Sequence, residues 1–221
     1  MINVYDETKE FMYENGFYLT SQPYRIGNLL AHYEMYQMIT NFPGGVLELG
    51  VFKGASLIQW ATFRELLENE NSRKIIGFDT FGEFPDVRAV EGDKKFVKDW
   101  NETFQGEFLS EDELLKSLKL KNFKNIELVK GDICKTLPDY LKKNAQMKLA
   151  LLHIDTDVYE PGRIGLELLY DRVIPGGLIV FDDYGVVEGE TRAVDEFFAG
   201  KDICLHKFPF SHHKPCYMVK K

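Results

Sequence analysis

LALLHIDTDVYEPG, residues 149–162, begins as an apolar strand and ends in two carboxylates, Asp155 and Asp157. The pattern recurs in GGLIVFDDYG, where a second apolar run ends in Asp182 and Asp183. Continuous apolar runs of this kind are typical of parallel strands that are buried on both faces. The carboxyl ends of parallel strands meet at one edge of the sheet, which is where such sheets bind their ligands. We therefore expect a functional site at this edge.

Strand and helix patterns alternate along the rest of the chain. Three further apolar runs end in or beside Gly50, Asp79 and Asp132, and helical patterns such as ASLIQWATFRELLENE lie between them. This alternation predicts an α/β protein with a mostly parallel sheet and helices on both faces. Five successive strands then end beside an acid or a glycine at the same edge of the sheet.

The length of 221 residues favours a single domain spanning 1–221. Residues 1–40 are interpreted as an N-terminal helical segment, because apolar side chains recur at helical spacing within them. Residues 82–112 are polar and weakly periodic, and we interpret them as a lid or helical insertion. Ser110 and Glu113 have the spacing of a capping box for the helix that follows.

The last twenty residues contain two candidate strands. DICLHKFPF and KPCYMVKK are interpreted as closing strands, and SHHKP is interpreted as the turn between them. The positive charge of HHKP is assigned to a solvated edge. We therefore assign no role to His212 and His213.

The composition limits the classes of partner. Lys and Arg total 27 against 35 acids, a net charge of −8, which argues against nucleic acid because phosphate binding requires clustered Lys and Arg. Cys134, Cys204 and Cys216 show no zinc-site spacing and are too few for a disulfide scaffold. The N-terminus does not resemble a signal peptide, and no apolar stretch approaches the roughly eighteen residues of a membrane helix. We expect a cytoplasmic protein with no membrane or nucleic-acid partner, and a homo-oligomer is compatible with the sequence.

The motif ELGVFKGAS points to a cationic cofactor. It contains neither GxGxxG nor GxxxxGK[ST], the fingerprints of NAD-binding and P-loop proteins. Gly50 and Gly54 would let the backbone approach a ligand. Glu48 would repel a pyrophosphate but would suit S-adenosylmethionine, which carries a sulfonium and an ammonium and no phosphate. The alternative is a glycine turn beside a surface acid.

Two further acids are candidates for binding adenosine. Asp79 ends the second strand, where an acid can bind ribose hydroxyls, and the alternative is an aspartate that caps a loop. Asp132, in KGDI, could accept a hydrogen bond from the adenine amino group, although Gly-Asp is also common in turns.

The acids of the opening motif indicate a metal site. Residues i and i+2 of a strand point the same way, so Asp155 and Asp157 can enter one pocket if the strand stays extended. Together with Asp182 and Asp183 they would repel one another unless a cation neutralised them, and carboxylate oxygens suit Mg²⁺. The alternative is that these residues cap the following helices. His153, within the strand, is interpreted as a core residue and not as a base.

The chain resembles the macrocin O-methyltransferase family of S-adenosylmethionine-dependent sugar methyltransferases. The pairing of HIDTDVYEP with GGLIVFDDYG is the most specific element of this resemblance. The resemblance implies a class I methyltransferase fold, a Rossmann-like sheet of seven strands whose last strand is antiparallel. The matching stretches, from about residue 44 to 198, are GGVLELGVFKGASL, IIGFDTFGEFP, LVKGDICKTLP, LLHIDTDVYEP, VIPGGLIVFDDYG and TRAVDEFF.

The resemblance also implies a function and its residues. We expect a Mg²⁺-dependent transfer of a methyl group from S-adenosylmethionine to a hydroxyl of a sugar or sugar-containing small molecule, with Asp157 as general base. The expected cofactor-binding residues are Glu48, Gly50, Gly54, Ser56, Asp79, Asp132 and Asp155, and the expected metal ligands are Asp155, Asp182 and Asp183.

Three alternatives use the same residues. A metal-dependent α/β hydrolase or phosphatase would need the acid cluster but no cofactor pocket. A catechol-type small-molecule O-methyltransferase would keep the chemistry and change the acceptor. A non-catalytic binding or assembly protein would keep only the scaffold.

Overall fold

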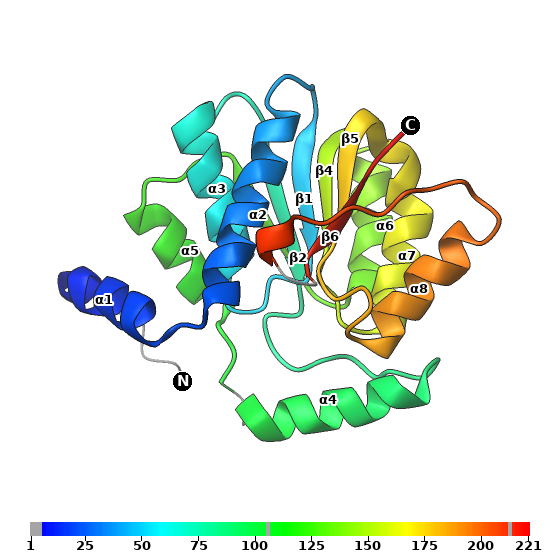
Figure 1. The fold of residues 1–221 in the computed structure, drawn as a ribbon, viewed down its shortest axis with the longest axis horizontal. Helices are drawn as coiled ribbons and strands as arrows, with labels where there is room; N and C mark the ends of the chain where they lie inside the picture. Colours follow the sequence, from blue (N-terminus) through cyan, green and yellow to red (C-terminus); the bar gives the residue numbers. More distant parts are fainter. Residues whose placement is uncertain (1–5, 105–106, 212–213) are drawn as a thin grey trace.

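The structure, a computed structural model, describes residues 6–104, 107–211 and 214–221. A six-stranded sheet forms the centre of this part of the chain. The strand order is β3-β2-β1-β4-β5-β6 (Figure 1). The first five strands are parallel and β6 is antiparallel to β5. The strands are β1 (Gly45–Leu49), β2 (Ile75–Asp79), β3 (Ile126–Lys130), β4 (Leu149–Ile154), β5 (Val173–Phe181) and β6 (Cys216–Val219).

Helices cover both faces of this sheet, as the sequence predicts (Figure 1). One face packs against α6 (Ile133–Lys143), α7 (Tyr159–Leu169) and α8 (Glu188–Phe198). The other packs against α2 (Pro23–Ile39), α3 (Ala55–Leu67) and α5 (Glu111–Leu120). The remaining elements are α1 (Glu10–Thr20), α4 (Glu91–Phe104) and the short 3-10 helices η1 (Glu7–Lys9), η2 (Tyr170–Arg172) and η3 (Pro209–Ser211).

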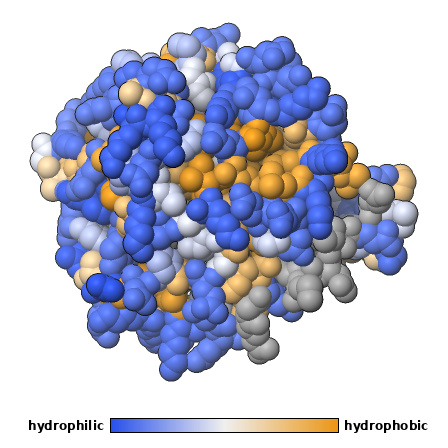
Figure 2. Space-filling model, turned by 180° about the vertical axis from the view of Figure 1, so that it is seen from behind, coloured by the Kyte–Doolittle hydropathy of each residue, from blue (hydrophilic) through white to orange (hydrophobic). Residues whose placement is uncertain are grey.

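The surface and the exposed helices differ from this core. From behind, the surface is largely hydrophilic, with hydrophobic side chains gathered near the centre of the view (Figure 2). No residue of α1 is buried. In the described ranges, every helix is either too short or too polar to cross a lipid bilayer.

The core explains why the apolar runs become strands. All six residues of β4 are buried, and its side chains divide between the two faces: Leu152 packs into the core with α6, α7 and α8, and Leu151 into the core with α2 and α3. A strand that is buried on both sides needs the continuous apolar run seen in the sequence.

Replacing Leu152 with alanine is expected to lower the free energy of unfolding by about 2–5 kcal/mol, because the side chain is fully buried and its removal leaves a cavity. Urea denaturation followed by circular dichroism measures the change. Leu66→Ala is the matched control. That side chain is 69% exposed on α3, so its loss is expected to change stability by no more than about 0.5 kcal/mol. Equal effects of the two substitutions would contradict this account of the core.

The strand order reverses between β1 and β4, and this reversal positions the site. The loops that follow these two strands diverge to opposite faces and leave a crevice beyond the sheet edge. Gly50, directly after β1, has φ +87°, and a Cβ atom there would lie 1.8 Å from the carbonyl oxygen of Asp155. The loop after β1 therefore requires glycine in order to approach the end of β4.

The number of strands differs from the seven that the resemblance implies. In the described ranges the sheet has six, because residues 203–208 meet β6 only at one isolated bridge. At this bridge His206 and Tyr217 exchange two backbone hydrogen bonds of 2.8 Å. One paired residue does not make a strand, so the prediction that DICLHKFPF forms a closing strand is wrong. His212 and His213, in the expected turn, lie outside the described residues.

Candidate active site

Three of the acids identified in the sequence come together at the ends of two neighbouring strands. Asp155 follows β4, and Asp182 and Asp183 follow β5. One carboxylate oxygen from each lies within 4.8 Å of the others. The two strands are adjacent in the sheet, and the Asp182 N–H donates to the Ile154 carbonyl at 2.9 Å. These oxygens are close enough for one cation to bind all three.

Asp157 reaches the same place by a different route from the one expected. Strand β4 ends at Ile154, and Asp157 has φ +59°, so the extended geometry does not persist to this residue. The left-handed turn instead brings its carboxyl group against Asp183. Burial, followed by the charge of Asp183, raises the pKa of Asp157 well above its ordinary value. Burial and the charge of Asp182 do the same to the pKa of Asp155.

Lys214 supplies a positive charge to this cluster. Its Nζ lies 2.5 Å from Asp183 Oδ1 and 3.5 Å from Asp182 Oδ2. Burial raises the pKa of Asp182, but His153 and Lys214 outweigh that effect and hold it below its ordinary value. The interpretation of HHKP as a solvated edge is therefore wrong for Lys214, because its ammonium group lies against two acids at the carboxyl end of the sheet.

Glu190 is a further acid of the cluster that the sequence analysis did not identify. It lies on α8, fully buried, and accepts hydrogen bonds from the Asp183 N–H (2.9 Å) and the Thr156 N–H (3.3 Å). Burial and the charge of Asp183 raise its pKa to about 8. Glu190 ties the loops after β4 and β5 together. No periodicity or spacing in the sequence distinguishes it from the exposed acids around it.

A pocket of about 660 Å³, part of it open to solvent, lies beside the acids. Its wall contains three of the expected cofactor-binding residues, Gly50, Asp79 and Asp155, together with the expected base Asp157. Segment 82–112 supplies an aromatic and apolar part of the wall. The residues of that part are Gly82, Phe84, Pro85, Trp100, Phe108 and Leu109.

Asp79 both lines this pocket and holds the glycine loop. Its Oδ2 accepts from the backbone N–H groups of Val51 (2.8 Å) and Phe52 (2.9 Å), and its Oδ1 accepts from Phe81 (2.6 Å). The loop-capping role is therefore present in the structure. Each carboxylate oxygen has more than one acceptor site, so this role is compatible with binding ribose hydroxyls.

Four of the expected cofactor residues lie outside the wall of the pocket. Glu48 is fully buried and accepts from the Ser56 hydroxyl at 2.5 Å. Gly54, with φ +80°, is the N-cap of α3. Asp132 is the N-cap of α6, where its Oδ1 accepts from the Cys134 N–H at 2.9 Å. Their contacts with a cofactor stay predictions.

A family comparison fits this geometry. The model of the family described as macrocin-O-methyltransferase (TylF) matches residues 24–206, which include both acid motifs and the glycine loop. The chain belongs to this family. The resemblance recognised in the sequence is thereby confirmed, and so is the class I methyltransferase fold.

Individual relatives agree with this assignment. The chain is 30% identical over 171 residues to demethyldecarbamoylnovobiocin O-methyltransferase of Streptomyces niveus, covering 74% of this chain and 61% of that protein. It is 28% identical over 153 residues to 8-demethyl-8-(2,3-dimethoxy-alpha-L-rhamnosyl)-tetracenomycin-C 4'-O-methyltransferase of Streptomyces olivaceus, covering 65% of this chain and 54% of that protein. The chain thus spans less than two thirds of the length of these relatives. The solved structure of CalS11, described as a TDP-rhamnose 3'-O-methyltransferase, superposes with a TM-score of 0.70 at 26% identity, covering 95% of this chain and 86% of CalS11.

Proposed function

We propose that this chain is an S-adenosylmethionine- and Mg²⁺-dependent O-methyltransferase that acts on a hydroxyl group of a sugar or sugar-containing small molecule. One observation carries the proposal: a single pocket contains Gly50 and Asp79 from the expected cofactor set together with Asp157, the expected base. Family membership supports the reaction type, and the sugar-modifying relatives support the class of acceptor.

The residues at the acid cluster suit Mg²⁺. Asp155, Asp182 and Asp183 offer only oxygen ligands, which hard divalent ions prefer. The Lys214 ammonium already contacts two of these carboxylates, so the cluster stabilises a cation at this position. When bound, Mg²⁺ would act as a Lewis acid and lower the pKa of an acceptor hydroxyl.

The protein's own part in the reaction is to orient the acceptor and remove its proton. S-adenosylmethionine supplies the methyl group and the leaving group. Asp157 lines the pocket next to Asp155 and is the carboxyl group proposed to take the proton from the acceptor. Its raised pKa makes its carboxylate a stronger base than an exposed aspartate. Positioning by the pocket wall converts an encounter between two small molecules into a reaction within one complex.

The proposal extends to segment 82–112 and to the N-terminal helix, within a single domain that spans residues 1–221. Trp100 of α4 and Phe84 line the pocket, which supports a lid that excludes water from the reacting groups. The α1 side chains of Phe11 and Leu19 are 73% and 83% exposed. Such an exposed apolar face supports self-association into a homo-oligomer.

Asp79→Asn is expected to weaken binding of S-adenosylhomocysteine by about 10- to 100-fold, because it removes charged hydrogen bonds at the pocket wall. Isothermal calorimetry measures the affinity. Asp132→Asn is the companion variant, since asparagine caps a helix as well as aspartate does. A loss of affinity without a loss of stability in this variant would support the proposed contact with adenine. Wild-type affinity in Asp79→Asn would contradict the assignment of Asp79.

Methyl transfer from labelled S-adenosylmethionine to nucleotide-linked deoxysugars, glycosylated small molecules and catechols tests the proposed function. Transfer to a sugar hydroxyl is expected. Transfer confined to catechols would assign the reaction to the catechol-type alternative. If calorimetry detects no S-adenosylhomocysteine binding and phosphate esters are hydrolysed, the hydrolase alternative is correct and the proposal is wrong.

A further inference from the structure

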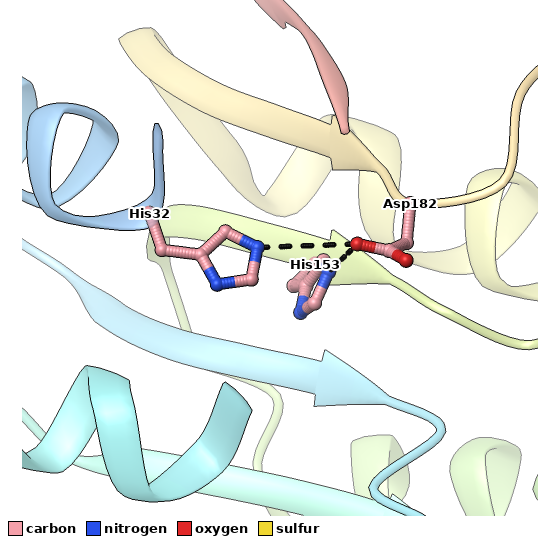
Figure 3. Close-up of side chains that lie close together, drawn as sticks. All are labelled: His32, His153 and Asp182. Atoms are coloured by element: carbon pink, nitrogen blue, oxygen red, sulfur yellow. Dashed lines mark ion pairs between the residues drawn. The ribbon is translucent and has the colours of Figure 1, made fainter. Parts of the chain in front are cut away.

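A second group of potential metal ligands lies next to the acid cluster (Figure 3). His32 from α2 and His153 from β4 both face Asp182, which follows β5. The Nε2 atom of His153 is 3.6 Å from Asp182 Oδ1, and the Nε2 atom of His32 is 3.9 Å from the same oxygen. The three ligand atoms lie within 4.8 Å of one another. From the sequence, His153 is expected in the core, and no pattern distinguishes His32.

The two imidazole nitrogens that face Asp182 lie at ion-pair distances from its Oδ1 atom, but no partner among the described residues is within hydrogen-bond distance of them. His153 is fully buried and His32 is 4% exposed. The Trp60 ring packs against both, with centroids 4.6 Å from His32 and 5.6 Å from His153. Buried polar atoms nearly always make hydrogen bonds, so two nitrogens that face one carboxylate oxygen from beyond hydrogen-bond distance require an explanation.

Gln59 influences which ring nitrogen of His32 carries the proton and which presents a lone pair to the carboxylate. Its Oε1 lies 2.7 Å from His32 Nδ1, and a carbonyl oxygen only accepts hydrogen bonds. With the Gln59 amide in this orientation, Nδ1 of a neutral ring carries the proton, and Nε2 presents a lone pair to Asp182 Oδ1. Two acceptors that face each other in a buried site repel, and a cation between them would convert this repulsion into two bonds.

His153 has an outer partner of a similar kind. Its Nδ1 lies 3.8 Å from Glu48 Oε2, an oxygen that is also buried and unpaired. Histidines that bind metals usually donate their other ring N–H to a carboxylate or carbonyl group, which fixes the orientation of the ring. Gln59 and Glu48 are placed to do this for the two histidines. Glu48 would thus belong to this site and not only to the cofactor loop.

We propose that His32, His153 and Asp182 bind a divalent transition-metal ion of the zinc type. Two imidazoles and one carboxylate favour such ions, whereas the oxygen-only acid cluster favours Mg²⁺. Ligand atoms in a tetrahedral zinc site lie about 3.4 Å apart, so small side-chain movements would complete the geometry. Asp182 would serve both sites: Oδ1 faces the histidines, and Oδ2 faces Lys214 of the acid cluster.

Binding of Co²⁺ to the chelator-stripped full chain tests this site without any methyl donor or acceptor. Visible absorption bands of Co²⁺ report nitrogen ligands, and calorimetry gives the affinity. His32→Gln is expected to weaken Co²⁺ binding by at least about 100-fold, and Gln59→Leu by about 10- to 100-fold through loss of the outer partner. Asp155→Asn, the matched control in the acid cluster, is expected to leave the absorption bands unchanged. Circular dichroism verifies that each variant folds.

Two outcomes would overturn the proposal. If folded wild-type protein binds no Co²⁺, the pair Glu48 and Asp182 instead holds a protonated His153. If Asp155→Asn abolishes Co²⁺ binding and Gln59→Leu has no effect, the ion occupies only the acid cluster. Gln59 does not itself bind the metal in this proposal, so its variant is informative even if His32→Gln fails to fold. Because no methyl transfer is measured, failure of the proposed function would leave these results unaffected.

Discussion

Asp157→Asn is expected to lower kcat by about 10²- to 10⁴-fold, the usual contribution of a general base. The substitution keeps the shape of the side chain and removes its negative charge together with its ability to take a proton. Asparagine also tolerates the left-handed backbone conformation at this position, where φ is +59°. Binding of S-adenosylhomocysteine is therefore expected to persist. Steady-state kinetics with a saturating sugar acceptor and calorimetry with S-adenosylhomocysteine measure the two quantities.

A control and a pH profile separate catalysis by Asp157 from a structural effect. Asp139→Asn, on the exposed side of α6, removes an acid whose side chain is 69% exposed and is expected to leave kcat unchanged. In the wild type, kcat is expected to rise with pH as the Asp157 carboxyl group loses its proton, and the part of this rise that belongs to Asp157 is expected to disappear in Asp157→Asn. Wild-type turnover in Asp157→Asn would exclude Asp157 as the base.

The acid cluster was predictable because it depends on sheet topology. Strands β4 and β5 are adjacent and parallel, so residues directly after them must lie close together. That rule places Asp155 beside Asp182 and Asp183 without knowledge of any side-chain packing. The alternation of strands and helices and the capping box at Ser110 and Glu113 follow from equally local rules and are present in the structure.

The positions of the other residues around Asp182 and Asp183 depend on how distant elements dock onto the sheet. His32 comes from α2, Glu190 from α8 and Lys214 from the segment before β6. A histidine within a helical pattern or an acid among exposed acids carries no signal of the partner it meets after docking. His153 shows the same limit: its burial follows from the apolar strand, but its position opposite Asp182 does not.

Asp183→Asn is expected to weaken Mg²⁺ binding and lower kcat by about 10²- to 10⁴-fold, because a Lewis acid contributes several kcal/mol to such a reaction. Chelation alone does not distinguish the two proposed cation sites, since a chelator removes both kinds of ion. Asp183 belongs only to the acid cluster, so its substitution tests the Mg²⁺ site without removing a ligand of the histidine site. Calorimetric titration with Mg²⁺ and turnover at increasing Mg²⁺ concentration measure the two effects.

Lys214→Met is expected to change the Mg²⁺ affinity in the opposite direction from Asp183→Asn. The Lys214 ammonium competes for the oxygens that the Mg²⁺ ion would bind, so its removal is expected to strengthen Mg²⁺ binding. The same removal leaves buried carboxylates without a counter-charge and is expected to lower the stability of the metal-free protein. If Lys214→Met instead abolishes turnover, and Mg²⁺ has no effect on Lys214→Met or on Asp183→Asn, the Lys214 ammonium is the cation of this site. The carboxylates then hold Lys214, and the Mg²⁺ requirement is wrong.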